Sequence, residues 1–187
     1  MTSDAAWTHL LRYAIGPCEL GHLLIAVGPQ GLRAVLLGDE HNALLSELSM
    51  RFSGETCRED DAGLRAWLSA VRAVVEGRSA NLAVPLDLRG TPFQLKVWKV
   101  LQAVPAGETV TYAELARRLG AAGSARAVAR ACAANPLAVV IPCHRVVRSD
   151  GALSGYRWGV GRKRVLLERE AWAAVESNDR GPALSSA

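Results

Sequence analysis

The stretches Thr111–Gly120 (TYAELARRLG) and Ser124–Ala134 (SARAVARACAA) indicate the fold of the second half of this chain. Each begins at a hydroxyl residue that can accept a hydrogen bond from the first turn of a helix, and Glu114 follows Thr111 at the spacing of a capping box. Asn135-Pro136 ends the second helix, since the residue before proline disfavours the helical conformation. Two helices joined by a glycine-containing turn predict a helix-turn-helix.

The second of these helices carries little side-chain volume. Between Ser124 and Ala134 it has six alanines, and its long side chains are Arg126 and Arg130. A helix that reads the major groove of DNA usually carries several long polar side chains. A smooth alanine face would instead lie close against a groove while one arginine reaches inward, or it would pack in the protein core. The helix alone does not decide between these two interpretations.

The two halves of the chain differ in their predicted secondary structure. Thr91-Pro92 caps a helix that runs to about Leu101 and places apolar residues on one stripe. Before it, β-rich segments near 8–15, 22–28 and 32–37 precede helical stretches near 40–52 and 60–76, and residues 84–90 read as a connector. We therefore expect a mixed α/β half with a packing role, followed by a mostly helical half.

The charge of the chain is unevenly distributed. The formal net charge of the 187 residues is +4 and the estimated pI is about 9.1. Between Thr91 and Glu168 the acidic residues are only Glu108, Glu114 and Asp150, whereas lysines and arginines are frequent. A basic second half favours nucleic acid as a partner over an ordinary solvated face. The apolar runs are too short to span a bilayer and no secretory signal is visible, so a cytoplasmic location is expected.

The four cysteines do not form a recognisable framework. They lie at positions 18, 57, 132 and 143, without a CxxC pair or zinc-finger spacing. Free thiols are therefore expected in a reducing cytosol. Cys18 with His22 supplies at most two ligands, which is a weak metal site, so we predict no metal.

The segment Ile141-Pro142-Cys143-His144-Arg145-Val146-Val147 places a thiol beside a histidine and an arginine. Histidine and arginine favour the thiolate, which is the nucleophilic form of cysteine. The apolar flanks predict a buried strand or tight turn, so the polar residues would lie in a pocket. An isolated cysteine of this kind is more often a small buried hydrophobic residue than a nucleophile.

The same segment, preceded by Asn135-Pro136 and followed by SDGALSGYRWGVGRKRVLLERE, resembles the active-site block of the methylated-DNA–protein-cysteine methyltransferases. The resemblance runs from about Arg12 to Ala171. Within the family, the chain is similar in particular to the alkyltransferase half of the bacterial adaptive-response regulator. It implies a ribonuclease-H-like α/β domain over residues 1–88 and a helical winged helix-turn-helix domain over residues 89–176. Residues 177–187 are expected to form a disordered tail.

The resemblance also implies the chemistry and its residues. The family transfers an alkyl group irreversibly from the oxygen at position six of guanine in DNA to its own cysteine, once per molecule. Cys143 would accept the alkyl group, His144 would act through a water, and Glu170 would orient the imidazole. Asn135 would hold the turn that carries the cysteine. Tyr112 would donate a hydrogen bond or a proton to the departing guanine.

The expected DNA contacts also come from the resemblance. Arg126 would take the place of the flipped nucleotide, since an alkyl carbon inside the base stack is poorly accessible. The residues expected to lie smoothly against the minor groove are Ala127, Ala129 and Ala131. The residues expected to line the pocket are Val146, Ser149, Ser154, Gly155, Tyr156, Arg157 and Trp158. Arg145 would support the loop through ion pairs.

This sequence departs from its relatives at two places. It begins too late to include the regulator's additional zinc-binding domain, so transcriptional activation is not expected. Val27 and Arg33 stand where a zinc-binding relative would have a cysteine and a histidine. We therefore expect no metal and no cofactor, a monomer, and double-stranded DNA containing O6-alkylguanine as the partner.

Three other functions remain to be distinguished from alkyl transfer. Alkyltransferase-like proteins bind damaged DNA without repairing it, but they carry tryptophan where this chain has Cys143. A cysteine hydrolase using Cys143 and His144 would turn over repeatedly. A sequence-specific transcription factor would discriminate among undamaged sequences, for which the alanine-rich helix offers little basis.

Overall fold

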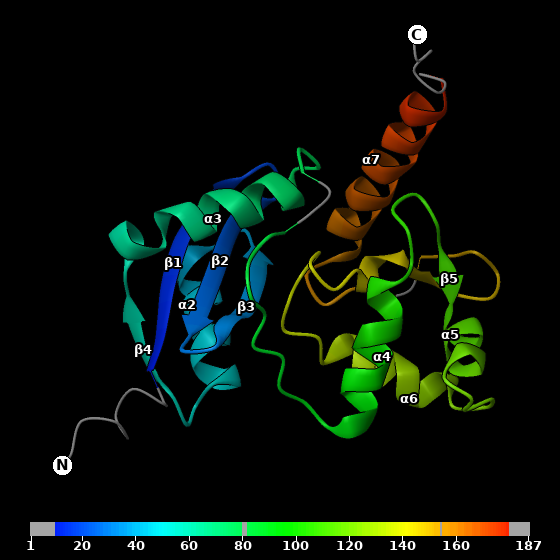
Figure 1. The fold of residues 1–187 in the computed structure, drawn as a ribbon, viewed down its shortest axis with the longest axis horizontal. Coiled ribbons are helices and arrows are strands. Elements are labelled where there is room, and N and C mark those ends of the chain that lie inside the picture. The colour runs from blue at the N-terminus through cyan, green and yellow to red at the C-terminus, as the bar shows by residue number, and fades with distance from the viewer. Residues whose placement is uncertain (1–9, 80–81, 154, 180–187) are drawn as a thin grey trace, which may run out of the picture.

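The computed structural model describes residues 10–79, 82–153 and 155–179, and it shows an α/β half beside a mainly helical half (Figure 1). The strands of the first half are β1 (Leu10–Cys18), β2 (Gly21–Gly28), β3 (Gly31–Gly38) and β4 (Thr56–Glu59). Their order is β3-β2-β1-β4. β1, β2 and β3 form an antiparallel meander, whereas β4 pairs parallel to β1.

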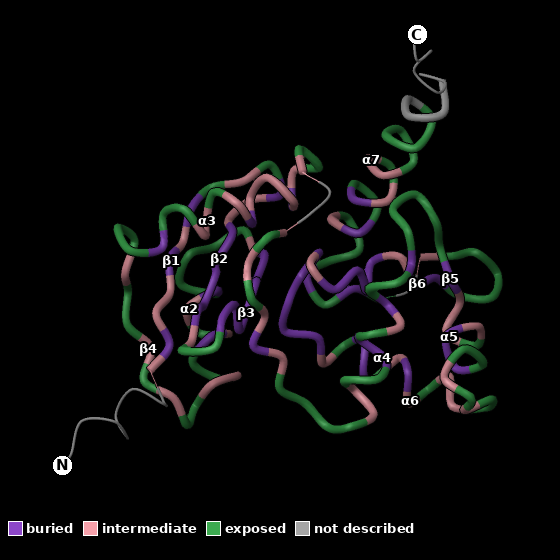
Figure 2. Tube along the Cα trace, in the orientation of Figure 1, coloured by how far each residue is buried: buried purple, intermediate pink, exposed green. Residues whose placement is uncertain are grey.

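Strand β2 inside the sheet and strand β3 at its edge are both covered on their two faces. Every residue of 23–27 in β2 and of 31–37 in β3 is buried, and Figure 2 shows these strands as continuous purple tubes. Helix α3 (Asp61–Val75) packs on β1 and β2, and helix α2 (His41–Arg51) packs on β3. The predicted β segments and helices of the first half are thus confirmed, except that residues 8 and 9 of the first segment lie outside the described chain. β4 was missed, because its four mostly exposed residues have no hydrophobic alternation.

The second half contains the predicted helices. They are α4 (Pro92–Gln102), α5 (Tyr112–Arg118) and α6 (Ala125–Ala133). Thr91 and Gln94 form a complete capping box at the start of α4. Thr111 accepts a hydrogen bond from the backbone of Glu114, but the Glu114 carboxylate pairs with Arg117 and Arg118.

The remaining elements surround the Cys143 segment. The 3-10 helix η1 (Cys143–Arg145) leads into β6 (Val146–Val147), which pairs parallel with β5 (Val110–Thr111). Helix α7 (Val160–Asp179) follows and projects from the molecule (Figure 1). The tail predicted from residue 177 is therefore wrong at its start, since α7 continues to Asp179; residues 180–187 lie outside the described chain. Among the described residues, no helix combines the length and hydrophobicity that a membrane crossing requires.

Arginines of the second half fasten it to the first. Arg162 of α7 donates to the carbonyl of Leu20 and to the carboxylate of Asp39. Arg169, two turns later, donates to the carbonyl of Val75 and to Glu19. These contacts join α7 to the turns and helix that border the sheet. The basic residues of the second half are therefore partly structural, which composition alone did not reveal.

The indole of Trp98 ties α4 to α6 in the core of the helical half. It is almost completely buried, and its Nε1–H donates to the carbonyl of Ala131 at 2.9 Å. Trp98→Phe leaves that carbonyl without its donor and opens a small cavity. We expect a loss of about 2 kcal/mol in the free energy of unfolding, measured by urea denaturation.

Trp172→Phe provides the matched control, because Trp172 lies on α7 with 72% of its surface exposed. We expect that substitution to leave the unfolding free energy unchanged within error. Equal losses for the two variants would show that the buried indole contributes nothing specific.

Candidate active site

Cys143 is the first residue of η1, and only 6% of its surface is exposed. Pro142, at φ −79° and ψ 58°, closes a tight turn in which the Cys143 N–H donates to the Ile141 carbonyl at 2.7 Å. The backbone that carries the side chains of Cys143 and His144 is thus a turn and not an extended strand. Those side chains still diverge, because successive residues of a 3-10 helix project about 120° apart.

The side chain of Asn135 organises this turn. It is completely buried directly after α6. Its Nδ2 donates to the carbonyls of Leu137 and Ile141, at 3.2 and 2.9 Å, and contacts the Cys143 Sγ at 3.2 Å. Its Oδ1 accepts from the Leu137 N–H at 2.8 Å. The predicted role of Asn135 in holding the cysteine-bearing turn is supported by this geometry.

His144, Arg145 and Glu170 form a connected cluster on the other side of η1. The His144 Nε2 lies 2.8 Å from Glu170 Oε1, and the Arg145 guanidinium donates to both carboxylate oxygens. Arg145 also donates to the carbonyl of Val104. Since an ionised carboxylate only accepts hydrogen bonds, Nε2 carries the proton and Nδ1 is left as the basic nitrogen. That Nδ1 is buried and meets no protein hydrogen-bond partner in the described part of the chain.

Burial dominates the ionisation of these groups. It raises the pKa of the Cys143 thiol to about 11, although the Asn135 hydrogen bond and Lys163 act in the opposite direction. Burial also lowers the pKa of His144, so both side chains are neutral near pH 7. For Glu170, burial raises the pKa, but hydrogen bonds from His144 and Arg145 outweigh it and bring the pKa to about 2. The resting site therefore holds a thiol, a neutral imidazole and a carboxylate, rather than the thiolate that the sequence suggested.

Lys163 of α7 is a site residue that the sequence analysis missed. It is completely buried, and its Nζ donates to the Val146 carbonyl at 2.5 Å. Burial lowers its pKa, whereas the nearby Cys143 and Cys132 raise it. A signal was present in the sequence, because Lys163, Leu166 and Glu170 share one helical face. An isolated lysine in a basic helix is normally solvent-exposed, so this spacing alone does not indicate a buried role.

Two aromatic residues cover the cluster. Tyr156 and Trp158 are buried, and their rings meet edge to face with centroids 5.2 Å apart. The ring of Tyr156 also lies edge to face against the His144 ring, with the ring centroids 6.4 Å apart. Between them, Arg157 points to Glu47 of α2 and donates to it at 2.8 Å. Ser154, also predicted to line the pocket, lies outside the described residues.

The predicted rim of the pocket is only partly supported. Ser149 is exposed in the loop after β6. Val146 is completely buried and its carbonyl accepts a hydrogen bond from Lys163, so it is not exposed at the surface, and its place in the pocket lining stays a prediction. The reason is that Val146 pairs with Val110 in the small parallel sheet, which a single sequence does not reveal.

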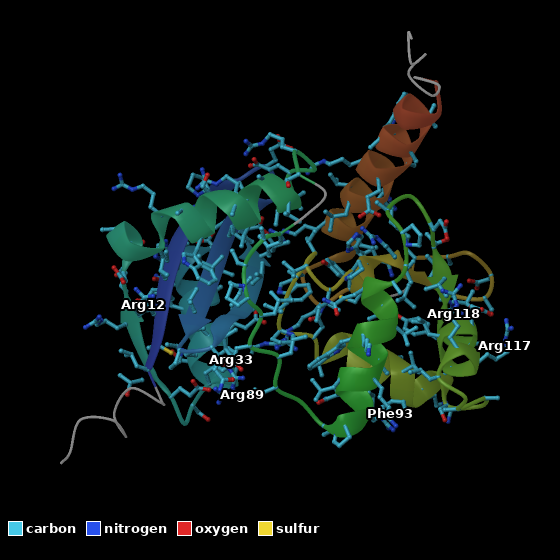
Figure 3. The ribbon with its side chains drawn as sticks, viewed as in Figure 1. Arg12, Arg33, Arg89, Phe93, Arg117 and Arg118 are labelled. Atoms are coloured by element: carbon cyan, nitrogen blue, oxygen red, sulfur yellow. The ribbon has the colours of Figure 1, made fainter. Side chains whose placement is uncertain are left out.

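The exposed side of α6 carries both of its arginines, Arg126 and Arg130. Ala127 and Ala129 are partly exposed, whereas Ala131 is buried together with Val128 and Cys132. The prediction that Ala131 lies on the groove-facing surface is therefore wrong, because its helical phase turns it toward α4. Tyr112 is partly exposed and is the first residue of α5, the other helix of the pair. Figure 3 shows Arg117 and Arg118 projecting from α5 away from the sheet.

The low pKa of Glu170 predicts a pH dependence of stability. Its folded-state pKa of about 2 lies below the ordinary value of 4.5, so the stabilisation is present above pH 4.5 and is lost as the pH falls through about 2. Between about pH 6 and about pH 3, wild type should lose about 2 kcal/mol more unfolding free energy than Glu170→Gln in urea denaturation. Glu168→Gln, at an exposed position of α7, should behave as wild type. Identical pH dependence in wild type and Glu170→Gln would contradict the strong pairing of this carboxylate.

Comparison with known proteins places these residues in a family. Residues 92–172 match the model of the 6-O-methylguanine DNA methyltransferase DNA-binding domain. The bifunctional transcriptional activator/DNA repair enzyme Ada of Escherichia coli K12 is 50% identical over 161 residues. That alignment covers 86% of this chain, which spans 46% of the length of Ada. The inducible methylated-DNA–protein-cysteine methyltransferase of Bacillus subtilis is 39% identical over 126 residues, covering 67% of this chain and 70% of the relative.

Solved structures agree with this over most of the chain. The O6-methylguanine methyltransferase of Mycobacterium tuberculosis superposes with a TM-score of 0.72 at 34% identity, covering 92% of this chain and 96% of that protein. The OGT of the same bacterium in complex with DNA gives a TM-score of 0.70 at 35% identity, with coverage of 93% and 96%. From its active-site segment, its mixed α/β and helical fold and these relatives, the chain belongs to the methylated-DNA–protein-cysteine methyltransferase family.

Proposed function

We propose that this protein repairs DNA by moving an alkyl group from O6 of guanine to the sulfur of Cys143, once per molecule. The observation that carries the proposal is a buried thiol held at 3.2 Å by the Asn135 amide, directly next to a histidine paired with Glu170 at 2.8 Å. A thioether product does not hydrolyse, so the protein is consumed. Family membership supports the same reaction.

The charge states suggest how the thiol is activated. Cys143 must lose a proton before its sulfur attacks the alkyl carbon, because burial keeps the thiol protonated. The Nδ1 of His144 accepts that proton through a water, while Glu170 holds Nε2–H and stabilises the imidazolium. The new S–C bond forms as the C–O6 bond breaks, and the electron pair of that bond stays on guanine. Tyr112 donates a hydrogen bond or a proton to the departing base.

The fold supports a finer description of the two halves. We assign residues 1–88 to a ribonuclease-H-like domain, since a three-stranded antiparallel meander with a parallel fourth strand beside β1 is compatible with that topology. Residues 89–176 would form the winged helix-turn-helix domain, with α5 and α6 as the helix pair. The small β5-β6 sheet would support the wing.

Double-stranded DNA containing O6-alkylguanine is the proposed partner. Arg126 and the partly exposed Ala127 and Ala129 lie on the outer side of α6, which suits docking in the minor groove and insertion of the arginine for a flipped base. The flipped guanine would enter beside Ser149 and the Tyr156–Trp158 segment, which must open because Cys143 is buried. A monomer and a cytoplasmic location remain predictions from the sequence. A solved relative in complex with DNA supports the choice of partner.

The decisive experiment measures stoichiometry. Incubation with duplex DNA carrying a labelled methyl group at O6 of guanine should label one equivalent of protein, and peptide mapping should find the label on Cys143. Cys143→Ala should take up no label while binding the duplex with a Kd within about twofold of wild type. Tight binding without labelling of wild type would favour a damage-binding protein, and label released into solution over many cycles would favour a hydrolase.

Arg126→Ala tests nucleotide flipping. We expect the transfer rate from duplex DNA to fall roughly 10- to 100-fold, because the extruded base loses the side chain that fills its place. Reaction with free O6-methylguanine should stay within about twofold of wild type, since no stack has to be opened. Arg130→Ala on the same exposed side of α6 is the matched control and should change both rates much less. Equal losses of Arg126→Ala on both substrates would remove the flipping role.

A further inference from the structure

The turn that carries Cys143 contains strained backbone. Val139 has φ 65°, and it is the only non-glycine residue with positive φ among the residues described. The Val140 N–H donates to the Ala138 carbonyl at 2.7 Å, so Val139 is the centre of a γ-turn with positive φ, which is rare. A β-branched residue in this region costs about 1–3 kcal/mol and persists only where the surroundings impose it.

Part of that support comes from the first half of the chain. Val35 of β3 donates its N–H to the Pro136 carbonyl and accepts from the Ala138 N–H, each at 2.9 Å. These two bonds form a parallel bridge between Val35 and Leu137. The start of the active-site turn is thus added to the edge of the N-terminal sheet, immediately before the strained Val139.

A bulge in β3 directs the backbone N–H and carbonyl of Val35 toward the active-site turn. Val27 pairs with Leu32 and Ala26 pairs with Ala34, so Arg33 is an extra residue in β3. Without it, Leu32 and Val35 would direct their backbone groups to opposite edges of the strand, because the direction alternates at each residue. With it, both face outward, and Leu32 also bonds the connector by donating to Pro85 and accepting from Asp87.

The side chain of Arg33 fastens the bulge. Its exposed fraction is 9%, and it donates to Glu55 at 2.9 Å while lying 3.7 Å from Asp87. Its guanidinium also lies over the Phe52 ring, 5.4 Å from the centroid. Asp87 is held in turn by Arg89, and Figure 3 shows Arg33 and Arg89 close together beside the connector. Removing Arg33 would leave the mostly buried carboxylate of Glu55 without this partner, while Asp87 would keep Arg89, and it would release the bulge.

We propose that Arg33 is a positioning residue for the acceptor cysteine, because it fixes the β3 bulge that holds the strained active-site turn through Val35. The N-terminal half would then contribute to reactivity and not only to packing. Loosening the bulge lets the turn around Val139 relax, which moves Cys143 away from the Asn135 amide. The inference rests on the proposed function only in that methyl transfer from DNA is the activity measured. The contacts of Arg33 and the bridge between Val35 and Leu137 do not depend on that function.

The test compares Arg33→Met with Arg12→Met in the full chain. Arg12 lies on β1 of the same sheet, away from the turn, and forms a more exposed ion pair of the same length with Asp60, the residue that precedes α3. Both variants are assayed at a temperature where circular dichroism shows them folded. The readouts are single-turnover methyl transfer as a function of pH, and the rate at which iodoacetamide modifies the Cys143 peptide, followed by mass spectrometry.

We expect Arg33→Met to slow methyl transfer per folded molecule roughly 10- to 100-fold. The pH midpoint of the transfer rate should shift upward by about one unit, because Cys143 moves away from the Asn135 amide whose hydrogen bond lowers its pKa. The other groups that face Cys143, which are Lys163, Cys132 and Tyr156, are unchanged in this variant. Arg12→Met should lower only the melting temperature. Wild-type rates and an unchanged pH midpoint in folded Arg33→Met would overturn the proposal.

If Arg33→Met does not fold, Asp87→Asn preserves the shape of the partner while removing its charge, and the same direction of change is expected. An unchanged pH profile in that variant counts against the proposal. If wild type transfers no methyl group from DNA, the proposed function fails, and the iodoacetamide rates of the variants still decide whether Arg33 positions the thiol.

Discussion

The hydrogen bonds of one buried amide support the whole reactive turn. Asn135 closes α6, accepts from the Leu137 backbone, and donates toward two carbonyls and the Cys143 sulfur. A completely buried polar side chain is stable only when its groups are paired, so the turn and the amide require each other. The turn places Cys143 at the start of η1, and η1 in turn places His144 where it contacts Glu170.

Burial gives the site a resting state that differs from an activated thiolate. The low dielectric environment favours the neutral thiol and the neutral imidazole, whereas Glu170 stays charged because it accepts bonds from His144 and Arg145. Such a site suits a protein that is used once, because a permanently exposed thiolate would react with other electrophiles. In the proposed mechanism, proton transfer to His144 would couple activation of the sulfur to the arrival of a base in the pocket.

Local signals in the sequence were sufficient for most elements. Thr91-Pro92, Thr111 and Asn135-Pro136 mark helix ends because capping and the proline ring act over a few residues. β4 and the Arg33 bulge were not predicted, since pairing depends on a partner strand far along the chain. The same limit explains Ala131, whose burial depends on where α4 lies, and Lys163, whose charge is accommodated by a carbonyl of β6.

The sequence by itself determined the order of most elements and the candidate residues for chemistry, because capping, hydrophobic periodicity and the Pro-Cys-His-Arg segment are all local patterns. The resemblance to a family added the roles of Asn135 and Glu170. Only the tertiary structure decided that the thiol rests protonated, that Arg145 and His144 share Glu170, and that β3 holds the turn. Ionisation and strain depend on burial and on partners brought together from distant segments, and those arise only when the chain packs.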